Sequence, residues 1–306
     1  MAQPLYKLRD WIPIEKLNWE FLSRNPNAVQ LLERNQENIN WFWLSENPNA
    51  IHILEKNLDK HINWAGLSSN PNAIHLLEAN QDKINWYHLT FNPNALSLLE
   101  RNLDKITDDW LVHNPNVYEL IEKGLFSVQI NAKRQSTRFG ILWYWICKNP
   151  KLMYIIEANL DKIQWQGLSW NPNAIHILER NFHNIDWGVL CRNPNALDLL
   201  EQNPSKIDWG YLSENKNKKA IKILEKNQDK IRWKELSKNP NAIHLLEKNQ
   251  DQLDWDWLSN NPSIFVYDYA AMRQTNRDLK EEIIQYVWHP TRVAKLLEMG
   301  LDPSEM

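Results

Sequence analysis

A 22-residue unit that recurs along most of the chain restricts its fold more than any other feature. One copy starts at Trp64 and reads WAGLSSNPNAIHLLEANQDKIN, and the next copy starts directly after it. A fixed short period predicts a repeat architecture, in which each unit packs mainly on its neighbours. The tryptophan, taken as position 0, recurs at Trp19, Trp41, Trp64, Trp86, Trp143, Trp165, Trp187, Trp209, Trp233 and Trp255, and an eleventh unit has Asp108 in that place.

Each unit predicts two short helices. The first has Asn or Asp as its N-cap, as at Asn63, and ends before Asn-Pro because the residue preceding proline is disfavoured in a helix. The second is expected to have Asn70 as its N-cap and Pro71 in its first turn. Position +16 is Asn in nearly every unit and glycine at Gly124, which predicts a left-handed residue that ends this helix.

Helical phase predicts which face of each unit is buried. Positions 0, +3 and +4 of the first helix share one side, so tryptophan, leucine and a small residue are expected in the core. The predicted fold is therefore all-α, an α-solenoid of about eleven 22-residue two-helix repeats with terminal caps. Stacking at helix-packing distance predicts an open path roughly 100 Å long.

The register of the repeat predicts the organisation of the chain. Residues 1–18 are expected to form an N-terminal cap, and 19–123 hold repeats one to five. Extra residues in 124–142 predict an inserted loop or bend between these repeats and repeats six to eleven, in 143–264. The pattern then ends, and 265–306 are expected to form C-terminal capping helices, over 278–288 and 291–299.

Charge and hydropathy restrict the location and the partners. A formal net charge of −3 gives no general attraction to nucleic acid or to anionic membranes. We expect no signal peptide and no membrane span, because no long apolar run occurs. A cytoplasmic location follows as the expectation, with no membrane partner.

Residues with chemically reactive side chains occur in repeat positions, which argues against an active site. Cys147 and Cys191 both occupy position +4, where most units have serine, and two layers of separation is too far for a disulfide. Histidine recurs at position +11, but only once per layer, which is too sparse for a metal site. No nucleophile-elbow, phosphate-loop or metalloprotease motif occurs. We therefore predict that the chain is not an enzyme and needs no cofactor or metal.

The candidate binding surface lies at positions +1, +2 and +5 of the first helices, which point away from the predicted core. Aromatic side chains concentrate there, and aromatic residues dominate interface energies. The predicted function is a non-catalytic scaffold or adaptor for a protein partner; alternatively, some of these rings cover gaps between repeats. The candidate residues are Trp43, Tyr87, His88, Phe91, Trp110, His113, Tyr144, Trp145, Trp170, Tyr211 and Trp257.

A second function fits the same surface. Helical-repeat proteins that bind single-stranded RNA read bases with a few variable side chains and with aromatic stacking. The acidic pI of 6.3 and acidic residues on the same face, such as Glu46 and Glu214, argue against nucleic acid.

The unit W-x-x-L-S-x-N-P-N-A-I-x-L-L-E-x-N-x-D-K-I-x resembles tandem repeats in uncharacterised proteins of giant amoeba-infecting DNA viruses. The resemblance covers 19–262 and implies no established activity. It implies a host cytoplasmic location, or a structural component of the virion. In one unit it is carried by Trp64, Leu67, Asn70, Pro71, Asn72, Ala73, Leu77, Glu78 and Asn80.

Overall fold

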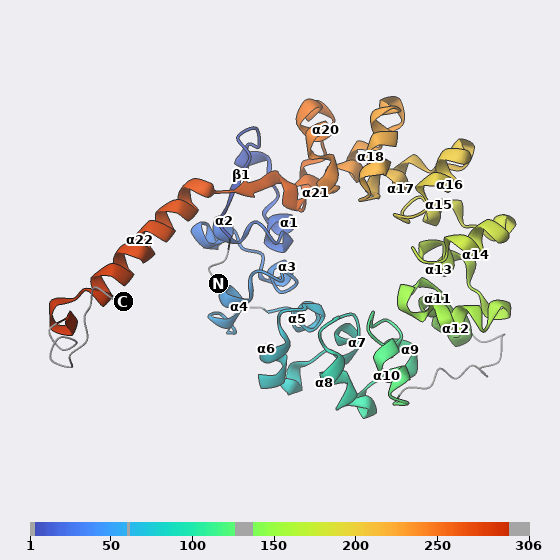
Figure 1. Cartoon of the computed structure of the whole chain (residues 1–306), viewed down its shortest axis with the longest axis horizontal. Helices are drawn as coiled ribbons and strands as arrows, with labels where there is room; N and C mark the ends of the chain where they lie inside the picture. Colours follow the sequence, from blue (N-terminus) through green and yellow to red (C-terminus); the bar gives the residue numbers. More distant parts are fainter. Residues whose placement is uncertain (1–3, 60–61, 126–136, 294–306) are drawn as a thin grey trace. The chain divides into compact units, whose positions relative to one another are not determined.

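The structure is a computed structural model that describes residues 4–59, 62–125 and 137–293. It divides into two compact units, residues 10–264 and a smaller unit of residues 1–9 with 265–306, and each is described separately. The larger unit consists of short helices in a repeating order (Figure 1), as the sequence predicts.

Two rows of α-helices make up the larger unit, with the first helices on the inner side and the second helices on the outer side (Figure 1). The first helices are α1 (Trp19–Arg24), α3 (Trp41–Leu44), α5 (Trp64–Ser69), α7 (Trp86–Leu89), α9 (Asp108–Leu111), α11 (Thr137–Lys148), α13 (Trp165–Trp170), α15 (Trp187–Leu190), α17 (Trp209–Glu214), α19 (Trp233–Ser237) and α21 (Trp255–Ser259). The second helices are α2 (Val29–Arg34), α4 (Ile51–Glu55), α6 (Ile74–Ala79), α8 (Leu96–Glu100), α10 (Tyr118–Glu122), α12 (Met153–Glu157), α14 (Ile175–Arg180), α16 (Leu197–Gln202), α18 (Lys218–Glu225) and α20 (Ile243–Lys248).

Short 3-10 helices form a third element that the sequence analysis did not predict. Most of them follow the second helix, and three lie at the Asn-Pro turn that follows a first helix, at η5 (Pro150–Leu152), η10 (Pro240–Ala242) and η12 (Pro262–Ile264). The others are η1 (Ile14–Lys16), η2 (Gln36–Asn38), η3 (Gln81–Lys83), η4 (Leu103–Lys105), η6 (Leu160–Lys162), η7 (Phe182–Asn184), η8 (Pro204–Lys206), η9 (Gln228–Lys230) and η11 (Gln250–Gln252).

The core lies between the two rows of helices. In the unit that starts at Trp64, Leu67 from the first helix and Ala73 and Leu77 from the second are fully buried. The tryptophans were expected in this core, and that prediction is wrong for all but Trp143, which alone among the ten is buried. The other nine are half-buried, and several lie under a lysine from the 3-10 segment, as where Lys83 Nζ is 4.8 Å from the centre of the Trp64 ring.

Two predicted helix boundaries are wrong for local reasons. The second helix begins at Ile74 and not beside Pro71, because Asn70 Oδ1 accepts a hydrogen bond from the Asn72 backbone N–H and closes a turn first. Position +16 is not left-handed when it is asparagine: Asn80 has φ −134° and ψ 51°, and its side-chain amide donates to a carbonyl one turn back. Gly124, at φ 68°, does adopt the left-handed conformation.

Serine at position +4 joins each repeat to the next. Ser68 Oγ donates to the Trp64 carbonyl one turn back and accepts a hydrogen bond from the Asn85 backbone N–H at 3.0 Å. Cys147 and Cys191 accept the equivalent backbone hydrogen bonds through Sγ, at 3.3 Å each. These cysteines are buried free thiols in a structural position, and they form no disulfide.

Asparagine at position +6 forms a second ladder between repeats. The buried Asn92 side-chain amide donates to the backbone carbonyls of Ser68 and Asn70 in the preceding repeat, at 3.1 and 2.7 Å. A second asparagine two residues later, Asn94, donates to the Pro71 carbonyl at 2.9 Å. The same bonds recur along the array, so these polar residues satisfy backbone carbonyls that no helix pairs.

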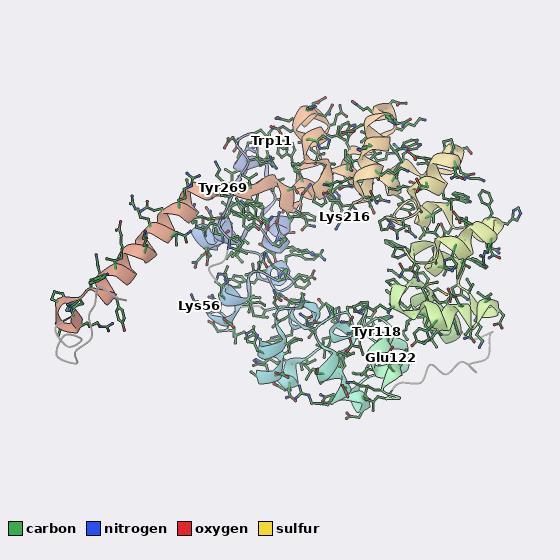
Figure 2. All side chains as sticks on the ribbon, viewed as in Figure 1. Trp11, Lys56, Tyr118, Glu122, Lys216 and Tyr269 are labelled. Atoms are coloured by element: carbon green, nitrogen blue, oxygen red, sulfur yellow. The ribbon has the colours of Figure 1, made fainter. Side chains whose placement is uncertain are left out.

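The ladder also joins the last repeat to the first. Asn25 Nδ2 donates to the carbonyls of Ser259 and Asn261, at 2.9 and 3.0 Å. The Asn18 backbone N–H donates to Ser259 Oγ at 2.8 Å, and Asn27 Nδ2 donates to the Pro262 carbonyl at 2.9 Å. Residues 10–264 therefore form a closed ring. The prediction of an open path is wrong, and the described side chains leave the centre of the ring open in this view (Figure 2).

The N-terminal residues complete the eleventh repeat. Glu15, Lys16, Leu17 and Asn18 match the Asp-Lys-Ile-Asn that ends other units, and Lys16 Nζ is 4.9 Å from the centre of the Trp255 ring. Leu17 is buried like its counterparts in other repeats. The expected cap at 1–18 is thus in part the missing end of a repeat.

Two further predictions need correction. The loop expected over 124–142 is helical from Thr137, where α11 begins, and 126–136 lie outside the described residues. In the smaller unit, 265–267 are a strand and not a helix: β2 (Phe265–Tyr267) pairs antiparallel with β1 (Tyr6–Leu8), followed by α22 (Tyr269–Val287). The helix predicted over 278–288 lies almost wholly within α22, whereas most of 291–299 lies outside the described residues.

Candidate binding groove

Nine of the eleven candidate residues belong to the first helices, and Phe91 and His113 lie two residues after the ends of α7 and α9, so all eleven belong to the inner row of the ring. Tyr87 and Tyr211 are exposed by 39% and 37%, and the others are half-buried. Half-burial arises because these side chains contact one another across repeats. The rings thus cover gaps between repeats and remain partly exposed to solvent.

Seven candidate aromatic and histidine residues form one cluster on repeats four to six. The Phe91 ring stacks on His113 with centroids 4.7 Å apart, and the His113 centroid lies 4.4 Å from that of Trp145. The Tyr87 ring packs edge-on against Trp110 at 5.4 Å. His88 contacts Tyr87, and Tyr144 contacts Trp145.

Cations continue the row beyond this cluster. Lys148 Nζ lies between two indoles, 4.7 Å from the centre of the Trp145 ring and 4.8 Å from that of Trp170. The Arg192 guanidinium lies 3.9 Å from the Tyr211 ring centre. Such cation–aromatic contacts fix long side chains in place and stabilise their positive charge.

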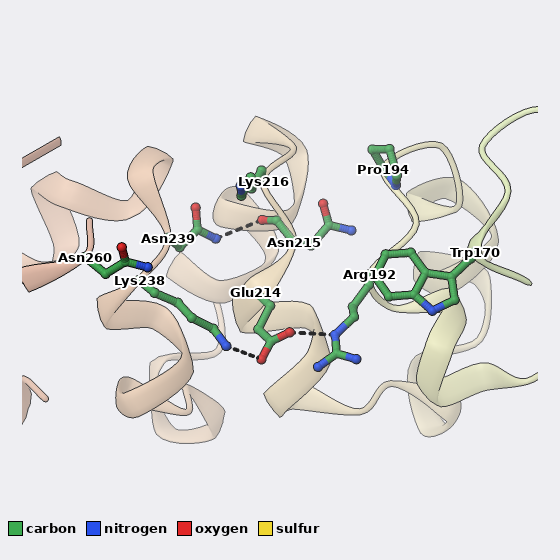
Figure 3. Close-up of a pocket in the computed structure, with 9 residues that line it drawn as sticks. All are labelled: Trp170, Arg192, Pro194, Glu214, Asn215, Lys216, Lys238, Asn239 and Asn260. Atoms are coloured by element: carbon green, nitrogen blue, oxygen red, sulfur yellow. Dashed lines mark hydrogen bonds and ion pairs between the residues drawn. The ribbon is translucent and has the colours of Figure 1, made fainter. Parts of the chain in front are cut away.

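Glu214 joins the cations of repeats eight and ten. Its carboxylate accepts from Arg192 Nε at 2.6 Å and from Lys238 Nζ at 2.7 Å (Figure 3). Burial alone would raise the pKa of Glu214, but the hydrogen bonds from Arg192 and Lys238 outweigh it and lower the pKa below the usual value. Lys238 also lies 4.7 Å from the centre of the Trp257 ring.

The row continues across the closure of the ring into the first repeats. The Trp257 ring packs against Phe21 of the first repeat with centroids 5.5 Å apart. Arg24 lies over the Trp43 ring at 5.5 Å and pairs with Glu46 at 2.9 Å. The inner row is therefore an alternation of rings and ion pairs that spans the two ends of the array.

A groove of about 530 Å³ runs beside this row in repeats seven to eleven (Figure 3). One wall consists of the side chains at position +5, and the other of the Asn-Pro turns. A smaller hollow of about 200 Å³, with Trp145 and Lys148 in its lining, lies beside repeats five and six. The larger groove is lined by Trp170, Arg192, Pro194, Glu214, Asn215, Lys216, Lys238, Asn239 and Asn260.

Close packing between neighbouring first helices limits what position +2 can hold. A Cβ atom built on Gly167 would lie 2.4 Å from the Tyr144 carbonyl oxygen, so only glycine fits there. Position +2 is therefore partly an inter-repeat contact, whereas position +5 borders the groove.

The thiols and histidines have structural partners. Burial raises the pKa of both Cys147 and Cys191 to about 11, which keeps the thiols protonated. On the outer row, His52 Nε2 lies 2.8 Å from Glu33 Oε1 of the preceding repeat, and the same pairing recurs at His75, His176 and His244.

Within the described residues, no group of three or more His, Cys, Asp or Glu side chains is placed to hold a metal ion. None of the helices in the described part of the chain combines the length and apolarity needed to span a bilayer. Comparison of the chain with protein-family models, with curated proteins and with solved structures gave no match.

The candidate residues predicted from the sequence do not include the charged members of the row. Lys148, Arg192, Glu214 and Lys238 were missed, although all four occupy position +5 beside the predicted aromatic residues. The available signal was the run of cations at that one position in repeats six, eight and ten. Residues far apart in sequence, such as Phe21 and Trp257, were not foreseeable as partners without ring closure.

Proposed function

We propose that this chain is a non-catalytic, ring-shaped scaffold that binds a protein partner through its inner row of first helices. The observation that carries the proposal is the alternation of rings and cations that borders an open groove of about 530 Å³. A surface whose side chains are already held by their neighbours loses little entropy when a partner binds. Tryptophan, tyrosine and arginine are also the residues that contribute most to protein interfaces.

The hydrogen bonds and ion pairs of the polar residues outside the groove support a scaffold function. The repeated serines and asparagines bond backbone groups of adjacent repeats, and the outer glutamates pair with histidine, arginine or lysine of the next repeat, as Glu78 does with Arg101. Both thiols have a raised pKa, which is opposite to the shift that a nucleophilic cysteine needs. The repeated serines and asparagines, the outer glutamates and the two thiols therefore have structural roles in this proposal.

The location belongs to the proposal as well. The resemblance of the repeat to tandem repeats of giant amoeba-infecting viruses favours an adaptor in the cytoplasm of an infected host cell. A structural component of the virion is the alternative location. Both settings are rich in protein partners, and neither requires catalysis.

The test is affinity capture from an amoebal lysate with the purified ring as bait. The variant combines Trp110→Ala, Trp145→Ala and Trp170→Ala, which removes rings on both sides of Lys148. We expect the partner captured by the wild-type chain to be lost, because the anchor rings are gone. The matched control is Tyr154→Ala, an exposed aromatic residue on an outer-row helix. Equal capture by a folded triple variant would place binding elsewhere.

Single-stranded nucleic acid is the alternative ligand. Bases bind such surfaces by stacking on open aromatic faces. Here Lys148 lies over Trp145 and Trp170, and Arg192 lies over Tyr211, so cations already occupy ring faces. This arrangement favours a protein ligand over stacked bases.

A further inference from the structure

The groove beside repeats seven to eleven has an uneven charge balance. Arg192 and Lys238 share one carboxylate, that of Glu214, so this trio has one positive charge in excess. Lys216 lines the same groove, is exposed, and forms no ion pair within the described part of the chain. The larger groove thus has two more positive than negative charges among its lining residues.

Lys148 adds a third uncompensated charge where the groove approaches the smaller hollow. Its ammonium contacts Trp170 of the larger groove while it lines the smaller one. Burial lowers the pKa of Lys148, and no carboxylate of the described residues pairs with it. A half-buried ammonium without a counter-ion gains stability from any carboxylate that reaches it.

The shape of the groove suits an extended chain. It passes five successive position +5 side chains, from Trp170 to Asn260. Four steps at helix-packing distance span about 32–40 Å, the length of about ten to twelve residues of extended peptide. Pro194, Asn215 and Asn239, from the turns after the first helices, line the other side of the groove (Figure 3).

From this placement we infer that the groove binds an acidic, extended segment of the partner protein, with carboxylates at Lys148 and Lys216. This inference rests on the proposed function and names the chemistry of the partner. Charge complementarity selects the partner, and the ring of Trp170 supplies apolar surface beside the cations. The charge excess is local, because the chain as a whole has a net charge of −3.

The test is a selection of random peptides of about 12 residues, the length that the groove accommodates, displayed on phage against the full-length chain. Selected peptides are then synthesised with a fluorophore and titrated by fluorescence anisotropy. A matched peptide has every Asp and Glu replaced by the corresponding amide. Lys148→Glu/Lys216→Glu is the test variant, and Lys216→Glu alone is the version in which only an exposed side chain changes.

The control variant is Lys226→Glu/Lys248→Glu, which makes the same charge change at exposed residues at the ends of outer-row helices. We expect selected peptides to be rich in Asp and Glu and their affinity to fall by about tenfold in the double groove variant, with little change in the control. The amide peptide should bind to the wild-type chain as weakly as the selected acidic peptide binds to the double groove variant. Single Lys216→Glu should show a smaller loss in the same direction.

Four results would overturn the inference. Peptides that bind without acidic enrichment, or that bind the groove variant as tightly as wild type, would contradict it and leave a protein-binding function standing. Selection of no peptide, with salt-sensitive binding of a 12-nucleotide uridine oligomer, would remove both this inference and the proposed function. Selection of nothing at all would also contradict an acidic-peptide groove.

Discussion

The side-chain amide of Asn25 donates a hydrogen bond to the backbone carbonyl of Ser259 at 2.9 Å, although 234 residues separate them. The same geometry joins neighbouring repeats, as where Asn193 donates to the Ser169 carbonyl at 3.0 Å. The contact between the two ends of the array is therefore chemically the same as a contact inside it. This equivalence is what makes residues 10–264 a ring, and several measurable consequences follow.

Removal of the Asn25 side chain and removal of the Asn193 side chain should lower the free energy of unfolding by similar amounts. Asn25→Ala and Asn193→Ala each remove a donor from two carbonyl oxygens. The Ser259 and Ser169 carbonyls are then left without a donor, whereas the Asn261 and Asn171 carbonyls keep a backbone N–H. We expect each to lower the free energy of unfolding by about 1–3 kcal/mol, because a buried acceptor loses its partner. Urea denaturation measures both. A much smaller loss for Asn25→Ala than for Asn193→Ala would indicate that the two ends are apart.

Leu17 should behave as a core residue although it lies near the N-terminus. It is 6% exposed and occupies the place that Ile231 occupies, at 6%, in the ninth repeat. Leu17→Ala should therefore cost about 2–5 kcal/mol, as truncation of a buried aliphatic side chain does. Ile231→Ala is the matched control, measured by thermal and urea unfolding. A negligible effect at Leu17 would mean that residues 14–18 do not complete the eleventh repeat.

The two thiols should be unreactive in the folded protein at neutral pH. Their pKa is raised from an ordinary value of 9.0 to about 11, because burial disfavours the thiolate. Alkylation by iodoacetamide, followed by mass spectrometry, should be slow at pH 7.5 and should accelerate as the pH rises toward 11 or when urea is added. Fast modification of the native chain at pH 7.5 would contradict the burial and the raised pKa of the two thiols.

The same shift predicts how the thiols affect stability. The folded-state pKa lies above the unfolded value, so the protonated thiols stabilise the fold fully below about pH 9 and lose that contribution as the pH rises through about 11. Cys147→Ser/Cys191→Ser should unfold with a free energy within about 1 kcal/mol of wild type at pH 7, because serine fills the same place elsewhere. Between pH 9 and 11 the double variant should lose less stability than wild type.

Glu214 should stabilise the ring in a pH-dependent way. Its pKa is lowered below the ordinary 4.5, since hydrogen bonds from Arg192 and Lys238 outweigh the cost of burial. The stabilisation is present above the unfolded pKa and disappears as the pH falls through the lower folded value. Glu214→Gln should cost about 1 kcal/mol at pH 7, because partial solvent exposure screens the ion pairs, and progressively less as the pH falls below the ordinary 4.5.

Glu225→Gln is the control for that comparison. Glu225 pairs with His244 on the outer row, where both side chains are exposed by 40% or more. Its loss should change the urea midpoint very little. Equal effects of the two substitutions at pH 7 would show that the Glu214 network adds nothing beyond an ordinary surface pair.

The repeat architecture was predictable because its signals are local. The tryptophan period, the Asn-Pro breaks and leucines such as Leu67 and Leu77 define two helices and a core in each unit, and this prediction is confirmed. The burial of the tryptophans was predicted wrongly, since helical phase cannot show that Lys83 supplies the cover for Trp64. Asn80 likewise satisfies its helix end through its side chain, without the left-handed backbone that Gly124 adopts.

Ring closure was harder to predict because it depends on a small rotation per repeat accumulated over eleven copies, and no single unit encodes that sum. One signal was present. Residues 14–18 copy the end of a unit whose remainder is missing, whereas the last unit stops at Ile264 without a second helix. The aromatic residues of the candidate site were chosen from the sequence. Its ion pairs were missed, because which side chains meet across repeats depends on how the repeats stack.

Ring closure is tested most directly by the distance between spin labels at Glu20→Cys and Lys234→Cys, in a chain in which Cys147 and Cys191 are serine. Both sites are exposed, on helices α1 and α19 of the first and tenth repeats. In a closed ring these repeats are two layers apart, so double electron–electron resonance should give a narrow distribution centred at about 20–30 Å, label arms included. A distribution centred at about 80 Å, as nine layers of an open array would give, would contradict the ring.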